Sequence, residues 1–515
     1  MEIQVGINKI EECLNSSVRV FGYGAGHYGH ALAWMSRQME WNLTGFLVSN
    51  GEKHPDEISD YPVMQVSEAG DLSDVSIILA VNEKNKSAIL SSLSETGLKI
   101  VILSSAFFDD LMYRYRIMDD SFALTAQKLR FWREGISYES MRVLFFTHGS
   151  ELLGANRSLL QNLLYWQAMG MESLIVSPNA GDLNKVLNKH NIPSLVAHFL
   201  WWVGDCDGGK IPDNTLVVDK LDSLLKNCCF NLVYSNSSVI NIGANMARKL
   251  DRPHIWHIRE FVEEDFGWHF FLGRKEALEY ILNNSNKAIC ISKALMSKCE
   301  DVVEQKNVFC LIPNGVSLDY AGTHKKDEFY QDVLRIGMCG FVKECKNQKE
   351  VLEALSLLPK EVLKHYEVEF YGPQDPIYQE VLNEYANSNL LKDRVKFLGY
   401  TTDVASHLCN CQIGVMASRM EAFGRVTVEY MLSGLLTIAS NTGANPELLE
   451  NGKYGLLYEF GNPKKLAECL IWCEKHRSKM QKMARQAQGE ALKRFDPQRT
   501  AMSVYDVIAN AINNK

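Results

Sequence analysis

Two carboxylates near the end of the chain have the spacing and setting to bind a ligand. Glu421 and Glu429 lie eight positions apart, with Gly424 between them. Residues 412–418 form a short apolar run of strand length, and the sequence then passes through the glycine into a helical pattern. A helix that begins at the carboxyl end of a strand directs free backbone N–H groups and the positive end of its dipole at an anion. The stretch therefore predicts a ligand site with an anion-binding part.

The elements around this stretch follow an α/β rhythm. Apolar runs of strand length alternate with helical patterns, which is typical of parallel sheets. The 515 residues are too many for one core, so we expect about three domains. We expect strands at 18–21, 43–48, 75–80 and 100–103, then at 143–147, 174–177, 216–218, 232–235, 253–257 and 288–292, and finally at 334–339, 368–371, 395–398, 413–417 and 436–440.

The first of these domains contains a glycine-rich turn. Gly24, Gly26 and Gly29 follow a strand and precede a helix, and their Gly-x-Gly-x-x-Gly spacing indicates phosphate or nucleotide binding. A dinucleotide site would also need an acidic residue at the end of the second strand, where Asn50 stands. A turn that simply needs glycines, a nucleotide-sugar or regulatory pocket, and an NAD site formed by residues 18–104 all remain open.

Composition and charge exclude several classes of function. The chain is 46% hydrophobic and 23% charged, as in ordinary globular proteins, and its net charge of -8 argues against a mainly electrostatic nucleic-acid partner. Thirteen cysteines without a Cys-x-x-Cys pair, an acidic N-terminus and no apolar run of membrane length predict a cytoplasmic protein with reduced thiols. Asp205 and Asp207 precede two glycines in a turn-like setting, so we expect no metal there.

The stretch from Glu421 resembles the retaining GT-B glycosyltransferases of family 4, whose mark is Glu-x7-Glu. The flanking Phe-Gly and the later segment 443–447 match the family as well, as do Gly154 to Leu159, His257, Pro313 to Val316 and Lys346, in the family's order. The resemblance covers about residues 141–515. It implies an α/β protein of the GT-B fold, in which two Rossmann-like domains face a cleft.

The resemblance also implies domain boundaries. The two GT-B domains would span 141–328, on the acceptor side, and 329–496, on the donor side, and a last helix at 497–515 would cross back onto the first. Residues 107–140 would be a helical connector. Residues 1–106 resemble the Rossmann-like nucleotide-binding accessory domains of some bacterial sugar-modifying enzymes.

Residues on the donor side acquire roles from the resemblance. Glu421 would contact donor-sugar hydroxyls on the reacting face, Glu429 would accept hydrogen bonds from the ribose hydroxyls, and Lys346 would hold the diphosphate. A leaving diphosphate without a metal needs such cationic side chains and oriented backbone dipoles. Glu447 would either lie near the donor or cap the turn after Gly443. The remaining donor-side candidates are Gly340, Lys343, Phe423, Gly424, Arg425 and Val426.

One residue departs from the family pattern. The family usually has an arginine directly after the position of Gly340, and this chain has Phe341. Lys343 or Arg425 could replace the missing cation. On the acceptor side, the resemblance assigns His257 to the transferred sugar, and the acceptor candidates are Gly154, Asn156, Arg259 and Glu260.

The resemblance therefore implies a metal-independent, retaining hexosyltransferase that needs no cofactor. It would move a sugar from a nucleoside diphosphate sugar to a glycan or lipid-linked acceptor in bacterial surface polysaccharide synthesis. A lipid-linked acceptor would bring it to the inner face of the membrane. Two alternatives are a sugar-nucleotide-binding scaffold with weak turnover, which Phe341 suggests, and an NAD-dependent enzyme that acts through residues 18–104.

Overall fold

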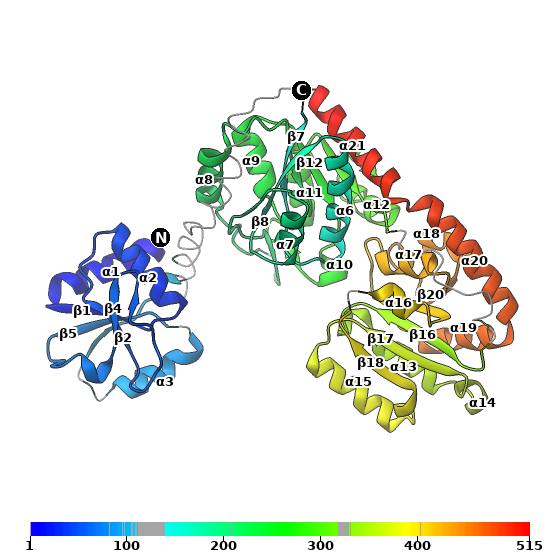
Figure 1. The fold of residues 1–515 in the computed structure, drawn as a ribbon, viewed down its shortest axis with the longest axis horizontal. Coiled ribbons are helices and arrows are strands. Elements are labelled where there is room, and N and C mark those ends of the chain that lie inside the picture. The colour runs from blue at the N-terminus through cyan, green and yellow to red at the C-terminus, as the bar shows by residue number, and fades with distance from the viewer. Residues whose placement is uncertain are drawn as a thin grey trace. The chain divides into compact units, whose positions relative to one another are not determined.

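The computed structural model describes residues 2–81, 83–94, 96, 98–104, 107–108, 111, 140–205, 208–317, 329, 331–401 and 403–514. The chain forms two compact units, Met1–Leu124 and Thr125–Lys515. Figure 1 colours them along the chain, with the first unit in blue. Most of the connector expected at 107–140 lies outside the described residues.

The first unit is a Rossmann-like sheet with helices around it. Its sheet has the order β3-β4-β2-β1-β5-β6, and all pairs are parallel except β3 with β4. Buried Phe46 and Ile78 pack in its core together with Phe107 and Leu111. Its elements are α1 (Glu2–Ser16), β1 (Arg19–Tyr23), α2 (His27–Gln38), β2 (Gly45–Val48), β3 (Glu57–Ile58), β4 (Tyr61–Gln65), β5 (Val75–Leu79), α3 (Glu83–Leu93) and β6 (Lys99–Val101).

The second unit begins with a seven-stranded parallel sheet in the order β15-β14-β12-β11-β7-β8-β9. We call this part, residues 140–317, the first half. Its strands are β7 (Arg142–Phe146), β8 (Glu172–Ser177), β9 (Ser194–Val196), β11 (Leu232–Ser235), β12 (His254–Ile258), β14 (Lys287–Cys290) and β15 (Phe309–Leu311), with a separate two-stranded antiparallel sheet of β10 (Val203–Gly204) and β13 (His269–Phe270). Its helices are α6 (Gly154–Ala168), α7 (Asp182–Lys189), α8 (Thr215–Leu225), α9 (Ile242–Leu250), α10 (Glu263–Phe266), α11 (Arg274–Asn283) and α12 (Lys293–Glu300).

One expected strand of this half is wrong. Residues 216–218 lie in helix α8. The apolar run looked like a strand because it is short and partly β-branched, but Val217, Leu221 and Leu225 continue it at a spacing of four residues, and all three are fully buried. This spacing places them on one face of a helix.

The second half, residues 329–496, contains a six-stranded parallel sheet in the order β18-β17-β16-β19-β20-β21. Its strands are β16 (Leu334–Cys339), β17 (Tyr366–Tyr371), β18 (Val395–Gly399), β19 (Ile413–Met416), β20 (Leu436–Ser440) and β21 (Leu456–Tyr458). Its helices include the 3-10 turn η4 (Glu344–Lys346), α13 (Gln348–Ser356), α14 (Lys360–Leu363), α15 (Pro376–Ser388), α16 (Val404–Leu408), α17 (Arg425–Leu432), α18 (Asn445–Leu448), α19 (Pro463–Lys475) and α20 (Arg477–Arg494).

The last helix, α21 (Pro497–Asn513), packs on the first half rather than on the second. It is drawn in red in Figure 1. The indole N–H of Trp166 on α6 donates to the carbonyl of Ala501 at 2.8 Å. Val504 and Ile508 are fully buried in the same apolar core as Trp166. The first and the last elements of the second unit therefore both belong to the first half.

The two parallel sheets of the second unit each reverse their strand order near the middle. From β16 the chain passes to β17 on one side and later to β19 on the other, and β7 is likewise flanked by β8 and β11. The loops that follow such strands diverge and leave a crevice at their carboxyl ends, which is where open α/β sheets bind ligands. In the second half these are the loops after Cys339 and Met416.

Candidate functional site

The site centres on an ion pair between these two loops of the second half. Nζ of Lys346, on the turn η4, lies 2.6 Å from Oε1 of Glu421. Burial disfavours the charged lysine, but the charge and hydrogen bond of Glu421 outweigh burial and raise the pKa of Lys346. Both side chains were predicted as site residues from separate parts of the sequence, and the fold brings them into contact.

Two glycines fix the loop that carries Glu421. Gly424 has a φ of 77° and precedes α17, whose free N–H groups begin there. Gly443 has a φ of 54°, and a Cβ on it would lie 2.4 Å from the carbonyl oxygen of Glu421. The N–H of Ala444 donates to that same carbonyl at 2.9 Å. The segment after β20 therefore packs directly on the backbone of Glu421, which accounts for a glycine at 443.

Glu429 is held inside the protein by a neighbour on its own helix. It is buried, and its Oε1 accepts from Nε of Arg425 at 3.1 Å. Arg425 also donates to Oγ of Ser158 at 3.2 Å and to the carbonyl of Gly315 at 3.3 Å, both in the first half. The two predicted donor-side residues therefore form part of the contact between the halves.

Phe423 and Val426 flank the start of α17. The Phe423 side chain is buried against Phe495, with the ring centroids 5.8 Å apart, and Val426 is half-buried. The packing of Phe423 thus fixes the loop, while the side chain of Val426 stays partly exposed.

His257, at the end of β12, presents one ring nitrogen to the site. Its Nδ1 receives hydrogen bonds from the hydroxyl of Tyr234 and from Nη2 of Arg259. Arginine can only donate, so Nδ1 accepts and the proton of the neutral ring is on Nε2. Burial, together with the charge of Arg259, holds the pKa of His257 well below its usual value. Nε2 is buried and has no partner among the described residues, which makes it an available N–H donor.

Arg259 and Glu260 are occupied by the protein itself. Arg259 donates to Oδ1 of Asn236 and of Asn314, each at 2.8 Å, besides its contact with His257. Glu260 accepts from the hydroxyl of Ser237 and, at 3.0 Å, from the N–H of Ser238. In this structure both residues fix the loops at the ends of β11 and β12, and neither was recognised in that role from sequence.

The other acceptor-side candidates lie at the start of α6. Gly154 is the first residue of this helix. Asn156 is buried, and its Nδ2 donates to the carbonyls of Gly149 and Glu151 at 2.9 Å each. Its Oδ1 is buried and has no partner among the residues described. Asn156 therefore shapes the loop between β7 and α6 and keeps one acceptor available.

Phe341, which stands where the family usually has an arginine, is partly exposed at the surface. The ring is 40% exposed, and Nζ of Lys343 lies 5.6 Å from its centroid. Gly340 has a φ of 133°, and a Cβ on it would meet no atom within 4 Å. A cation thus stands beside the position of the missing arginine, next to an open stretch of backbone.

Glu447 has a role that the sequence did not indicate. Its carboxylate oxygens lie 3.2 and 2.9 Å from the N–H of Lys293, the first residue of α12 in the first half. Burial raises the pKa of this carboxyl, against the hydrogen bonds that lower it. Glu447 therefore links the two halves by completing the start of a helix.

The glycine-rich turn of the first unit forms as expected between β1 and α2. Gly26 is the residue before the helix, and a Cβ on Gly29 would lie 2.0 Å from the carbonyl oxygen of Gly24. At the end of β2, Oδ1 of Asn50 accepts from the N–H of Ser67 at 2.9 Å. The close packing of Gly29 on Gly24 accounts for the glycine spacing, and nucleotide binding there stays a prediction.

In the part of the chain that the structure describes, no group of three His, Cys, Asp or Glu side chains is placed to hold a metal ion. Of the Asp205–Asp207 pair, the second residue lies outside the described residues. No described helix is both long and apolar enough to cross a membrane.

A family model described as "Glycosyl transferases group 1" matches residues 322–490. This stretch, about a third of the chain, is similar to the group 1 glycosyl transferases. This match contains both Lys346 and Glu421, as well as Glu429 and Glu447. The match spans most of the second half and does not include the first half.

Curated relatives of this chain include an uncharacterized glycosyltransferase of Methanocaldococcus jannaschii, which is 25% identical over 236 residues, 45% of this chain and 61% of its own length. The N-acetyl-alpha-D-glucosaminyl L-malate synthase of Bacillus anthracis is 23% identical over 249 residues, 46% of this chain and 64% of its own length. The chain thus spans somewhat less than two thirds of these relatives.

The solved structure of Alr3699/HepE from Anabaena in complex with UDP matches 72% of this chain and 100% of its own, with a TM-score of 0.61 and 21% identity. A second structure of that protein, in complex with UDP-glucose, gives a TM-score of 0.60. The second unit therefore has the GT-B fold, as the sequence predicted.

Proposed function

We propose that this protein is a glycosyltransferase that moves a sugar from a nucleoside diphosphate sugar to a glycan or lipid-linked acceptor. The observation that carries the proposal is the Lys346–Glu421 pair, 2.6 Å apart at the reversal point of the second sheet and inside the stretch that is similar to the group 1 glycosyl transferases. A cation beside a carboxylate suits a substrate with an anionic leaving group and a hydroxyl-rich sugar.

Each part of the donor has a group to receive it. Lys346 and the free N–H groups at the start of α17 stabilise the diphosphate as it leaves with negative charge. When the donor binds, Lys346 lies between the phosphate and Glu421, and Glu421 accepts from sugar hydroxyls. Nε2–H of His257 donates to the transferred sugar, and Glu429 accepts from the ribose hydroxyls. Lys343 supplies the cation that Phe341 lacks.

The donor we propose is a uridine diphosphate sugar. The complexes of HepE with UDP and with UDP-glucose support this choice. We further propose retention of configuration and catalysis without a metal or other cofactor, as the family 4 resemblance implies. Synthesis of bacterial surface polysaccharide in the cytoplasm, at the inner face of the membrane when the acceptor is lipid-linked, is the setting that fits these substrates.

Carboxylate-to-amide variants test the function. Glu421→Gln and Glu429→Gln should each lower UDP release from UDP-glucose by about a hundred-fold or more, because each keeps its shape but loses the charge that binds hydroxyls. Glu468→Gln, at an exposed position on α19, is the matched control. Full turnover in both variants would refute the assignment.

The same assay tests the finer claims. Turnover should persist in excess EDTA, and NMR of the first-formed product should give the anomeric configuration of the donor. Inversion would refute retention, and loss of turnover that Mg²⁺ or Mn²⁺ restores would refute metal independence. Each result leaves the glycosyltransferase assignment itself standing.

A scaffold that binds the donor without turnover is the second candidate. The observation in its favour is Phe341, 40% exposed where the family has a cation. Binding of UDP-glucose by calorimetry without UDP release, over a panel of donors and acceptors, would select this candidate.

A further inference from the structure

The loop after β12 contains a strained backbone position. Val262 has a φ of 75° and a ψ of -63°, and its side chain is buried. These angles describe a classic γ-turn, which is rare and costly, above all for a β-branched residue. Strain of this kind persists only where the surrounding structure enforces it, and it concentrates at functional positions.

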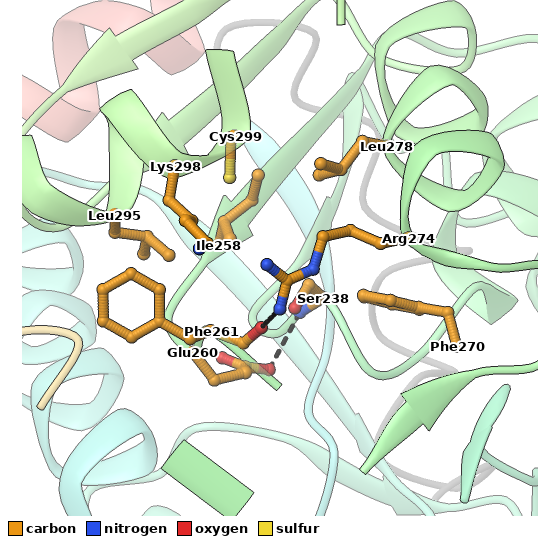
Figure 2. A pocket seen from close by; sticks show the side chains of 10 residues that line it. All are labelled: Ser238, Ile258, Glu260, Phe261, Phe270, Arg274, Leu278, Leu295, Lys298 and Cys299. Carbon is orange, nitrogen blue, oxygen red and sulfur yellow. Dashed lines mark hydrogen bonds between the residues drawn. The ribbon is translucent and has the colours of Figure 1, made fainter. Parts of the chain in front are cut away.

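Arg274 supports this loop from behind. Figure 2 shows Arg274 of α11 reaching into the pocket behind the loop, toward the carbonyl of Phe261. It donates to Oε1 of Glu264 at 2.7 Å and to that carbonyl at 3.4 Å, and it lies 2.9 Å from Oε2 of Glu263. The guanidinium lines the pocket and supports the loop at its edge.

The strained turn leads to Asp265, whose carboxylate is only half used. Its Oδ2 accepts from the N–H of Phe261 at 2.9 Å. Its Oδ1 is buried and has no partner among the described residues. A buried acceptor without a donor costs free energy, so a loop built to create one indicates a group that arrives from outside.

The surroundings of Asp265 place it beside the ion pair of the other half. Burial raises the pKa of Asp265 to about 7, and the charges of Glu260 and Glu421 add to the rise. In turn, the charge of Asp265 helps to raise the pKa of Lys346. Asp265 of the first half is therefore close enough to the Lys346–Glu421 pair for the three charges to influence one another.

We propose that Asp265 binds the acceptor: its Oδ1 accepts a hydrogen bond from the hydroxyl that attacks the donor sugar. This inference rests on the proposed function. A carboxylate repels a diphosphate but accepts readily from a neutral hydroxyl, so the ligand of Oδ1 is the acceptor rather than the donor's phosphates. Because the charges of Asp265 and Glu421 influence one another, a hydroxyl held at Oδ1 would lie near the sugar that Glu421 contacts in the proposed function.

The test is Asp265→Asn in the full chain, with UDP-glucose as donor and alkyl glycosides as acceptors. The amide oxygen of the variant can still accept from Phe261, so the loop is kept. We expect the kcat/KM for the acceptor to fall about ten- to a hundred-fold, the value of a hydrogen bond to a charged group. Affinity for UDP-glucose should change less than about two-fold. Asp265→Glu keeps the charge but moves it, so its kcat/KM for the acceptor should lie between those of the parent and of Asp265→Asn.

The pH profile separates binding from a structural role. The parent's kcat/KM for the acceptor should decline as the pH falls through about 7, where Asp265 takes up a proton, and Asp265→Asn should lack that limb. The charged groups that face Asp265 are Glu260, Glu421 and Lys346, and they are unchanged in the variant. Asp219→Asn, at an exposed position on α8, is the control.

Three outcomes would overturn the inference. Acceptor kinetics of Asp265→Asn within two-fold of the parent would show that Oδ1 receives no hydroxyl. A lost affinity for UDP-glucose would place Asp265 in the donor site. A parent that binds UDP-glucose but transfers to no acceptor would refute the proposed function itself, and the inference with it.

Discussion

At the scale of single residues, the site depends on side chains that use one polar atom within the protein and keep the other for a ligand. Tyr234 and Arg259 occupy Nδ1 of His257 and thereby leave Nε2–H for a ligand. Phe261 occupies one oxygen of Asp265 and leaves the other. The supporting role of these residues was not recognised from sequence, although Arg259 was an acceptor-side candidate, because hydrogen bonds of this kind leave no trace in spacing or periodicity.

Tyr234→Phe tests this selection at His257. The variant removes one of the two donors to Nδ1, while Arg259 still holds the ring in the same tautomer. We expect kcat for UDP-glucose turnover to fall about three- to ten-fold, as for one hydrogen bond. His257→Ala should cost far more, because it removes the contact with the sugar. Equal losses in the two variants would contradict the separate roles.

At the scale of elements, most strands and the loops after them were predicted from the sequence. Apolar runs indicate buried strands, and glycines indicate the turns that follow. It missed β4, whose Pro62 weakens a strand pattern and which lies toward the edge of its sheet beside the two-residue β3. It also took residues 216–218 of α8 for a strand. Lys346 and Glu421 were both predicted as site residues. Their direct contact was not predicted, because 75 positions separate them in the chain.

Gly443→Ala tests how the segment after β20 positions Glu421. A Cβ there would lie 2.4 Å from the carbonyl of Glu421, so the loop must shift and UDP-glucose turnover should fall at least ten-fold. Gly461→Ala is the matched control, because Gly461 also has a positive φ, 76°, but open space around it. The control should lose only the free energy of a strained backbone, about 1 kcal/mol, measured by urea unfolding. Similar turnover in the two variants would contradict the role of the contact.

At the scale of the whole molecule, buried histidines link the stability of the fold to pH. His254 donates from Nδ1 to the carbonyl of Asn284 and accepts at Nε2 from Ser235. Burial lowers its pKa to about 4, and it does the same for His148. The unfolded chain binds protons at these residues below about pH 6.5, where the folded protein does not. Their contribution to stability is therefore complete above pH 6.5 and is lost as the pH falls toward 4.

His254→Asn should reduce this loss. The parent's free energy of unfolding should decrease by about 3 kcal/mol per buried histidine between pH 6.5 and 4. The variant should lose roughly two thirds as much as the parent, because His148 and His257 remain. Urea unfolding at a series of pH values measures the slopes. His190→Asn, at an exposed position, should keep the slope of the parent. An unchanged slope in His254→Asn would contradict a neutral buried ring.

Glu447 connects the second half to the support of the loop after β12, which carries Asp265. Its carboxylate completes the first turn of α12, and farther along that helix Nζ of Lys298 lies 3.1 Å from Oε1 of Glu264, at the base of the strained turn. A displacement of the second half would leave the start of α12 unsatisfied and loosen the support beneath Asp265. If the proposed function holds, the loop that receives the acceptor is therefore ordered only when the half that binds the donor is in place.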